Sequence, residues 1–142
     1  MLWDKLGVSL VVLSFLILTG CANTFGDLVR SKVEGEGMSR VYKVNVDQAW
    51  EIAKRVLKWE GAGDIKENRS EGYMLMKGGA DWFYKGTLIG VWIEPIDQVQ
   101  SKVTVITKSK RSVDTFRRLS ETDFHETFAL FVEGPEIRRE IK

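Results

Sequence analysis

The chain has 142 residues, and its 21 basic and 20 acidic side chains leave a formal net charge of +1. A dedicated nucleic-acid binder carries a strongly basic domain, so we expect no nucleic-acid partner. The chain contains one cysteine and one histidine, which excludes an internal disulfide and a zinc site built from these residues.

The N-terminal segment has the pattern of a secretory signal. A short charged start is followed by residues 6–18, which carry no formal charge, and then by two small residues and a cysteine. This order matches the n-region, h-region and cleavage site of a signal peptide. Thirteen residues would span about 20 Å as a helix, less than the roughly 30 Å hydrocarbon core, so the pattern disfavours an uncleaved membrane-spanning helix.

The motif Leu18-Thr19-Gly20-Cys21 resembles the lipobox of bacterial lipoprotein precursors. The resemblance implies cleavage between Gly20 and Cys21, a diacylglycerol thioether on Cys21 and acylation of the new amino terminus. Residues 1–20 would then be the signal peptide, and Cys21 would anchor the mature chain in a membrane. Many Gram-negative lipoproteins use Asp after the cysteine for inner-membrane retention. Ala22 therefore implies the outer membrane, with the domain facing the periplasm.

After the anchor we expect a tether and then one folded domain. Residues 21–37 show no sustained period of two or 3.6 residues and contain three glycines, which favours a flexible tether, although Phe25, Leu28 and Val29 could rest on the domain. The domain is expected over residues 38–134, followed by a charged tail at 135–142. Val41 to Val46 alternates like a strand with one buried face. A helix capped by Asp47 is predicted to run to about Glu60.

Four strand patterns follow without a helix between them. They cover residues 64–68, 72–77, 87–94 and 102–108, and the short turn-like sequences between them imply antiparallel neighbours. The third is apolar on both faces and should be central, whereas the fourth should have one wet face. A second helix is predicted to begin at Ser120, in a capping-box arrangement with Asp123, and to end at Gly134.

The expected order is β-α-β-β-β-β-α, an α+β fold with a curved antiparallel sheet and two helices on one face. This order resembles the helix-grip domains, including those of the component C lipoprotein of the β-barrel assembly machine. Small envelope lipoproteins of similar layout are equally close. A shared fold does not define a shared function.

Two surface features are candidates for contacts. Trp82, Phe83 and Tyr84 are adjacent in a predicted loop, where neighbouring rings cannot all point inward, so we expect contact with a partner or the membrane surface. The alternative is that this loop folds back over the sheet. A basic stretch could contact an anionic surface or be a solvated strand end; its residues are Lys102, Lys108, Lys110, Arg111, Arg117 and Arg118.

Other residues that could carry chemistry have structural interpretations. His125 is predicted to be a partly buried structural imidazole, and Met74 and Met76 to fill the core. The sequence contains no nucleophile elbow and no phosphate-binding glycine loop. We therefore predict no catalytic residue, no metal and no cofactor.

The sequence leaves two functions open. The first is a non-catalytic docking or assembly module that binds an envelope protein or a second copy of itself. The alternative is a carrier that encloses a lipid or a hydrophobic small molecule between the helices and the sheet. A cavity there would favour the carrier, and a packed core would favour docking.

Overall fold

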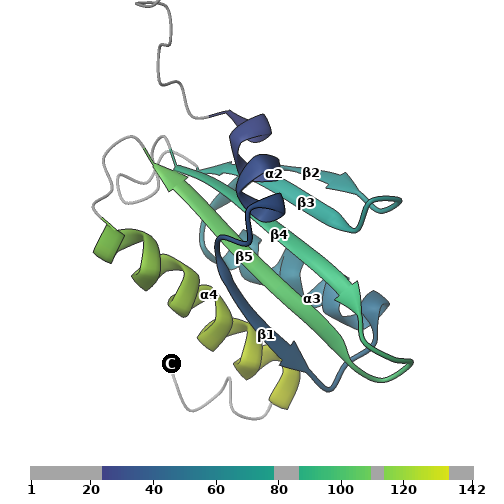
Figure 1. The fold of residues 1–142 in the computed structure, drawn as a ribbon. Helices are drawn as coiled ribbons and strands as arrows, with labels where there is room; N and C mark the ends of the chain where they lie inside the picture. The colour runs from purple at the N-terminus through teal and green to yellow at the C-terminus, as the bar shows by residue number, and fades with distance from the viewer. Residues whose placement is uncertain (1–23, 79–86, 110–113, 135–142) are drawn as a thin grey trace, which may run out of the picture.

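The computed structural model describes residues 24–78, 87–109 and 114–134, with side chains of 62 and 114–119 left out (Figure 1). It confirms the predicted α+β class. The elements in chain order are α2 (Phe25–Val33), β1 (Met38–Tyr42), α3 (Val46–Trp59), β2 (Ala62–Asn68), β3 (Tyr73–Gly78), β4 (Thr87–Pro95), β5 (Ser101–Ser109) and α4 (Asp114–Glu133).

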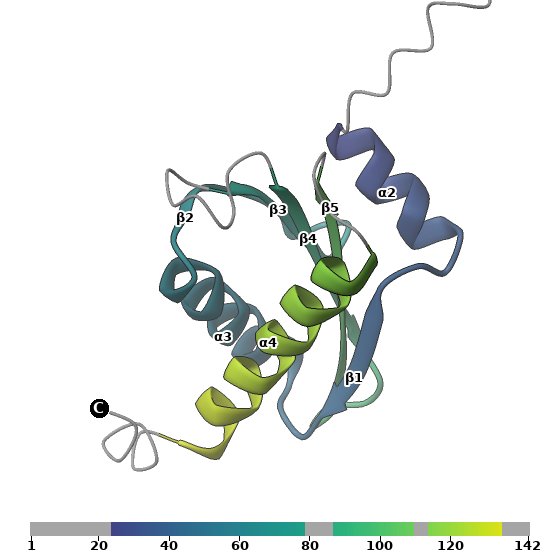
Figure 2. The same cartoon turned by 90° about the vertical axis from the view of Figure 1, so that its left-hand side faces the viewer.

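The strands form one antiparallel sheet in the order β1-β5-β4-β3-β2. β4 lies at the centre, as its apolar sequence predicted, and its first seven residues are buried. Helices α3 and α4 cover one face of the sheet, and α2 lies on the other (Figure 2). The structure therefore has a helix on the face that the sequence analysis left uncovered.

Helix α3 begins earlier than predicted. Its N-cap is Asn45, whose side chain accepts the Gln48 N–H at 2.8 Å, while the Gln48 side chain accepts the Asn45 N–H at 3.1 Å. This reciprocal capping box satisfies two free amides of the first turn, so the predicted cap at Asp47 was wrong. The preceding strand accordingly ends at Tyr42 and not at Val46.

Helix α4 also begins earlier, at Asp114 and not at Ser120. The sequence offered a capping box at Ser120, but this hydroxyl is buried inside the helix and donates to the Thr107 hydroxyl at 3.3 Å. A serine that bonds a neighbouring strand is not free to cap. The predicted end of the helix is confirmed, since Gly134 follows it with φ of 114°, a conformation that favours glycine.

The main core lies between the sheet and helices α3 and α4. Trp50, Phe124 and Phe128 are at most 1% exposed, and the predicted core residues Met74 and Met76 are fully buried. A cavity lined by these side chains would leave them accessible surface. The described residues therefore pack closely here.

Trp59 does not join this core. Its side chain is 64% exposed. It is the last residue of the helix, and the chain turns away immediately after it, at Gly61 with φ of 88°. Trp59 therefore contributes little to the burial that holds α3 on the sheet.

The expected tether is in part a helix. Thr24 caps α2 in a reciprocal box with Asp27, and Leu28 is fully buried against the sheet. A nine-residue helix is too short to be stable alone, so its packing against the sheet is what forms it. The prediction of a flexible tether was therefore wrong for Phe25–Val33, and the alternative that Leu28 rests on the domain is confirmed.

Candidate docking surfaces

Most of the predicted site residues lie outside the described part of the chain. These include the lipidation and cleavage residues Gly20 and Cys21. Arg117 and Arg118 lie in α4, but their side chains are not described. The remaining predicted contacts outside the described residues are Trp82, Phe83, Tyr84, Lys110 and Arg111.

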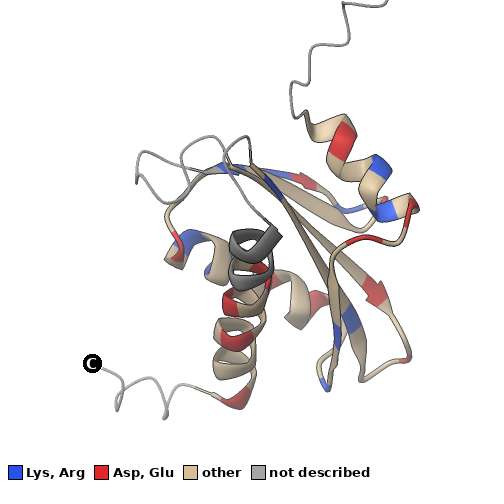
Figure 3. Ribbon diagram, turned by 60° about the vertical axis from the view of Figure 1, so that its left-hand side comes forward, with Lys and Arg blue, Asp and Glu red and all other residues tan. Residues whose placement is uncertain are grey.

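The two described lysines of the basic stretch lie far apart. Lys102 and Lys108 are both on β5, on the face that α2 covers, and they are six positions apart, which is about 20 Å along a strand. Lys102 Nζ lies 3.5 Å from Glu94 Oε2, and Lys108 Nζ lies 2.7 Å from Glu36 Oε2. Figure 3 shows an acidic residue near the start of α2 and basic residues towards its end. These two lysines are therefore charge-compensated and do not form a joint cationic patch.

The face that α2 covers has its own apolar cluster. Leu28 of α2 packs there with a strand cluster consisting of Leu75, Leu88, Trp92 and Ile106, none more than 7% exposed. A Cβ placed on Gly90 would overlap the Trp92 ring, so glycine at this position lets the indole lie flat on β4. The second apolar face of the sheet is therefore occupied by this chain's own helix.

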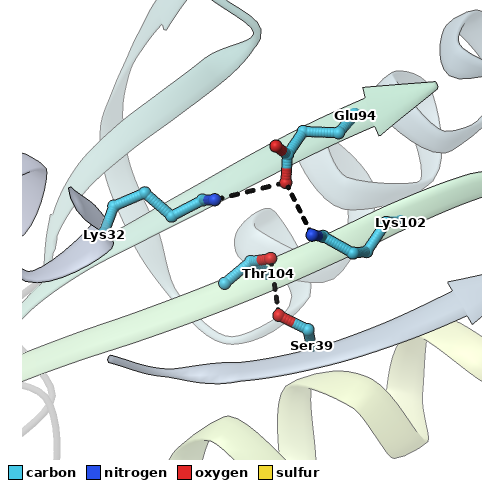
Figure 4. Close-up of polar contacts among 5 residues, drawn as sticks. All are labelled: Lys32, Ser39, Glu94, Lys102 and Thr104. Atoms are coloured by element: carbon cyan, nitrogen blue, oxygen red, sulfur yellow. Dashed lines mark hydrogen bonds and ion pairs between the residues drawn. The ribbon is translucent and has the colours of Figure 1, made fainter. Parts of the chain in front are cut away.

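An ion pair joins α2 to the central strand β4. Lys32 Nζ lies 3.2 Å from Glu94 Oε2, which also faces Lys102, while Ser39 and Thr104 share a hydrogen bond of 2.7 Å nearby (Figure 4). Ion pairs as exposed as these contribute about 0–1 kcal/mol each. Burying a leucine contributes roughly 1.5–3 kcal/mol. Burial of Leu28 therefore contributes most to the packing of α2 on the sheet, and the ion pairs orient the helix.

Exposed apolar side chains gather at one end of the sheet. Ile96 and Val99 lie in the turn between β4 and β5 and are 53% and 66% exposed, and Val41 near the end of β1 is 54% exposed. The strand register brings them to the same end, since Val41 lies opposite Lys102 and Pro95 opposite Ser101. We call Val41, Ile96 and Val99 the hairpin end. Single exposed apolar residues are ordinary, but three at one end form a candidate contact surface.

The predicted structural role of His125 is confirmed, and its burial is complete. Its Nε2 donates to the Met38 carbonyl oxygen at 2.9 Å, so in the neutral ring Nδ1 accepts from the Tyr42 hydroxyl at 2.7 Å. Burial lowers the pKa of His125 and raises the pKa of Tyr42 to about 12. Both groups therefore stay neutral near pH 7 and fasten β1 to α4.

Two carboxylates, like His125, accept hydrogen bonds that join a helix to the sheet. Glu67 accepts the Trp50 indole N–H at 2.6 Å and pairs with Lys54 at 3.0 Å, and these hydrogen bonds lower the pKa of Glu67. Glu121 is buried and accepts the Thr107 N–H at 3.0 Å. These contacts hold α3 and α4 on the sheet.

One carboxyl is shifted in the opposite direction. Burial at the end of α3, with a smaller contribution from Asp123, raises the pKa of Glu60 to about 7. A shifted carboxyl can mark a catalytic site when it has reacting partners. Within the described residues, however, no three acidic, histidine or cysteine side chains group as metal ligands would. No helix in this part of the chain is long and apolar enough to cross a bilayer.

The comparisons with known proteins give no family assignment. No protein-family model matches the chain, and no curated protein is significantly similar to it. The geometry and the sequence motifs are therefore the basis for assigning function.

Proposed function

We propose that this chain is a membrane-anchored envelope lipoprotein whose α+β domain is a non-catalytic docking or assembly module. The observation that carries the proposal is the Leu18-Thr19-Gly20-Cys21 motif, which closes an apolar stretch shortly before the first described residue. An anchor of this kind places the domain on the periplasmic side of the outer membrane. Its partner is an envelope protein or a second copy of the chain.

Two features favour docking over the alternative of a lipid or small-molecule carrier. The large side chains between the sheet and helices α3 and α4 retain almost no accessible surface, which leaves little room for a ligand among the described residues. The hairpin end, in contrast, exposes Val41, Ile96 and Val99 to solvent. Apolar side chains of this kind at the centre of an interface can supply binding energy.

The lipid anchor is tested by Cys21→Ser. We expect this change to abolish lipidation and cleavage, because serine has no thiol to form the thioether. Mass spectrometry of the membrane-extracted protein should find acylated Cys21 as the first residue of the wild type. A peptide in which an unmodified Cys21 is still joined to Gly20 would contradict the proposal. Density-gradient fractionation then tests which membrane holds the protein. Comigration with inner-membrane markers would contradict the outer-membrane assignment.

The docking surface is tested by site-specific photocrosslinking in cells. A photoreactive residue at Val99 should give a discrete crosslinked product in the lipidated protein, whereas one at Glu51, which is exposed on α3, should give none. The same probe at Trp82 tests the aromatic segment directly. A product at Trp82 alone would move the docking surface to that segment. Absence of products at both positions would contradict docking.

A further inference from the structure

The described N-terminal helix leaves very little chain between the lipid and the folded domain. Thr24 already caps α2, and only Ala22 and Asn23 lie between it and Cys21. The three Cα–Cα steps from Cys21 to Thr24 reach at most about 11 Å. A flexible tether through residue 37 would instead extend to roughly 55 Å. The domain is therefore held against the surface that carries the lipid.

The position of α2 decides which part of the domain is held there. Its N-terminal end lies at the end of the sheet where β5 finishes, and the β4–β5 hairpin lies at the opposite end (Figures 1 and 2). The strand register defines these two ends of the sheet. Lys77, Leu88 and Lys108 form one row at the first end, and Pro95 faces Ser101 at the other. β4 has nine residues, so the two ends are about 30 Å apart.

We propose that the end of the sheet beside the N-terminus of α2 lies against the lipid surface and that the hairpin end points away from it. This orientation rests on the proposed lipid anchor at Cys21. We call the membrane-facing part the anchor end, defined by Phe25, Lys66, Lys77 and Lys108. The hairpin end then stands about 30 Å from the bilayer, where it can meet a periplasmic partner.

The anchor end has side chains that suit a lipid headgroup layer. Lys66 and Lys77 are exposed, and Lys66 Nζ lies 5.1 Å from the centre of the Phe25 ring. A lysine near an anionic lipid surface contributes about 1 kcal/mol. Asp27 of α2 and Asp64 of β2 supply opposing charge at this end, so attraction to the membrane is weak. The short covalent link, and not net charge, therefore sets the orientation.

The orientation can be measured with fluorescent labels on single introduced cysteines. Cys21 is the only cysteine and is acylated in the proposed mature form, so a new cysteine is the only free thiol. Lys77→Cys labels the anchor end and Gln98→Cys labels the hairpin end, and both positions are exposed. The lipidated proteins are placed in phosphatidylethanolamine and phosphatidylglycerol vesicles that contain a headgroup-attached contact quencher. We expect several-fold stronger quenching at position 77 than at position 98.

Inserting ten Gly/Ser residues between Ala22 and Asn23 provides the matched control. The insertion keeps the lipid and the fold but lengthens the link, so quenching at the two positions should become similar. Equal quenching without the insertion, in protein that is bound to the vesicles, would overturn the orientation and leave the lipid anchor intact. Protein that does not bind and carries unmodified Cys21 by mass spectrometry would contradict the lipid anchor itself, and the orientation with it.

Discussion

Phe128→Ala is expected to lower the free energy of unfolding by about 3–5 kcal/mol. Phe128 is fully buried, and its ring centre lies 4.4 Å from that of Tyr42 and 6.0 Å from that of Phe124. Truncation removes buried apolar surface and leaves a cavity between α4 and the sheet. Domains of this size are stable by about 5–15 kcal/mol, so the loss is a large share of the total.

Urea unfolding of the domain without its lipid anchor checks this result, with Leu130→Ala as the control. Leu130 lies two residues further along α4 and is 37% exposed, so its truncation should cost much less than that of Phe128. The slope of the free energy with urea should stay unchanged in both variants. An unfolding midpoint for Phe128→Ala equal to that of the wild type would show that α4 does not depend on this contact.

The elements with strong periodicity could be predicted from the sequence. Trp50, Ala53 and Val56 recur at helical spacing in α3, and all three are buried. The uninterrupted apolar stretch of β4 could be assigned to the centre of the sheet because both of its faces need cover. Such patterns repeat over several turns or residues, so a single ambiguous position does not obscure them.

Features that depend on one tertiary contact could not be predicted. In α2, Phe25, Leu28 and Val29 recur at helical spacing, but the segment has only nine residues, and Leu28 is its only fully buried apolar side chain. At the start of α4, Ser120 has the residue type of a cap, but Thr107 takes up its hydroxyl. Asn45 and Asp47 are both good caps in principle, and the Gln48 side chain decided between them.

One part of the candidate site could be proposed from the sequence without a fold. Cys21 and its preceding residues form a chemical motif, and the lipid anchor that it implies stays a prediction. The charge pattern of the basic stretch, in contrast, did not indicate that Glu94 and Glu36 would compensate Lys102 and Lys108 from distant parts of the chain. The hairpin end was missed because Val41 and Val99 are far apart in sequence and come to the same end of the sheet only through the register of β1, β4 and β5.

Leu28→Ala is expected to release α2 from the sheet while the rest of the domain stays folded. Leu28 is fully buried among Trp92, Ile106 and their neighbours, and truncating a buried leucine costs about 2–5 kcal/mol. The nine-residue helix cannot remain stable without that contact. Each 1.4 kcal/mol changes an equilibrium constant tenfold. A loss of about 2 kcal/mol or more should therefore raise the equilibrium constant for the detachment of α2 from the sheet by roughly thirtyfold or more.

Amide hydrogen exchange resolves this local opening. In Leu28→Ala, amides of residues 25–33 should exchange faster by that factor, while those of β4 keep wild-type protection. Val33→Ala in the same helix removes a side chain that is 83% exposed and should leave exchange unchanged. Release of α2 would also lengthen the link to Cys21, so the difference in quenching between labels at positions 77 and 98 should shrink. Wild-type protection of α2 in Leu28→Ala would show that the ion pairs of Lys32 and Lys108, and not apolar burial, hold the helix in place.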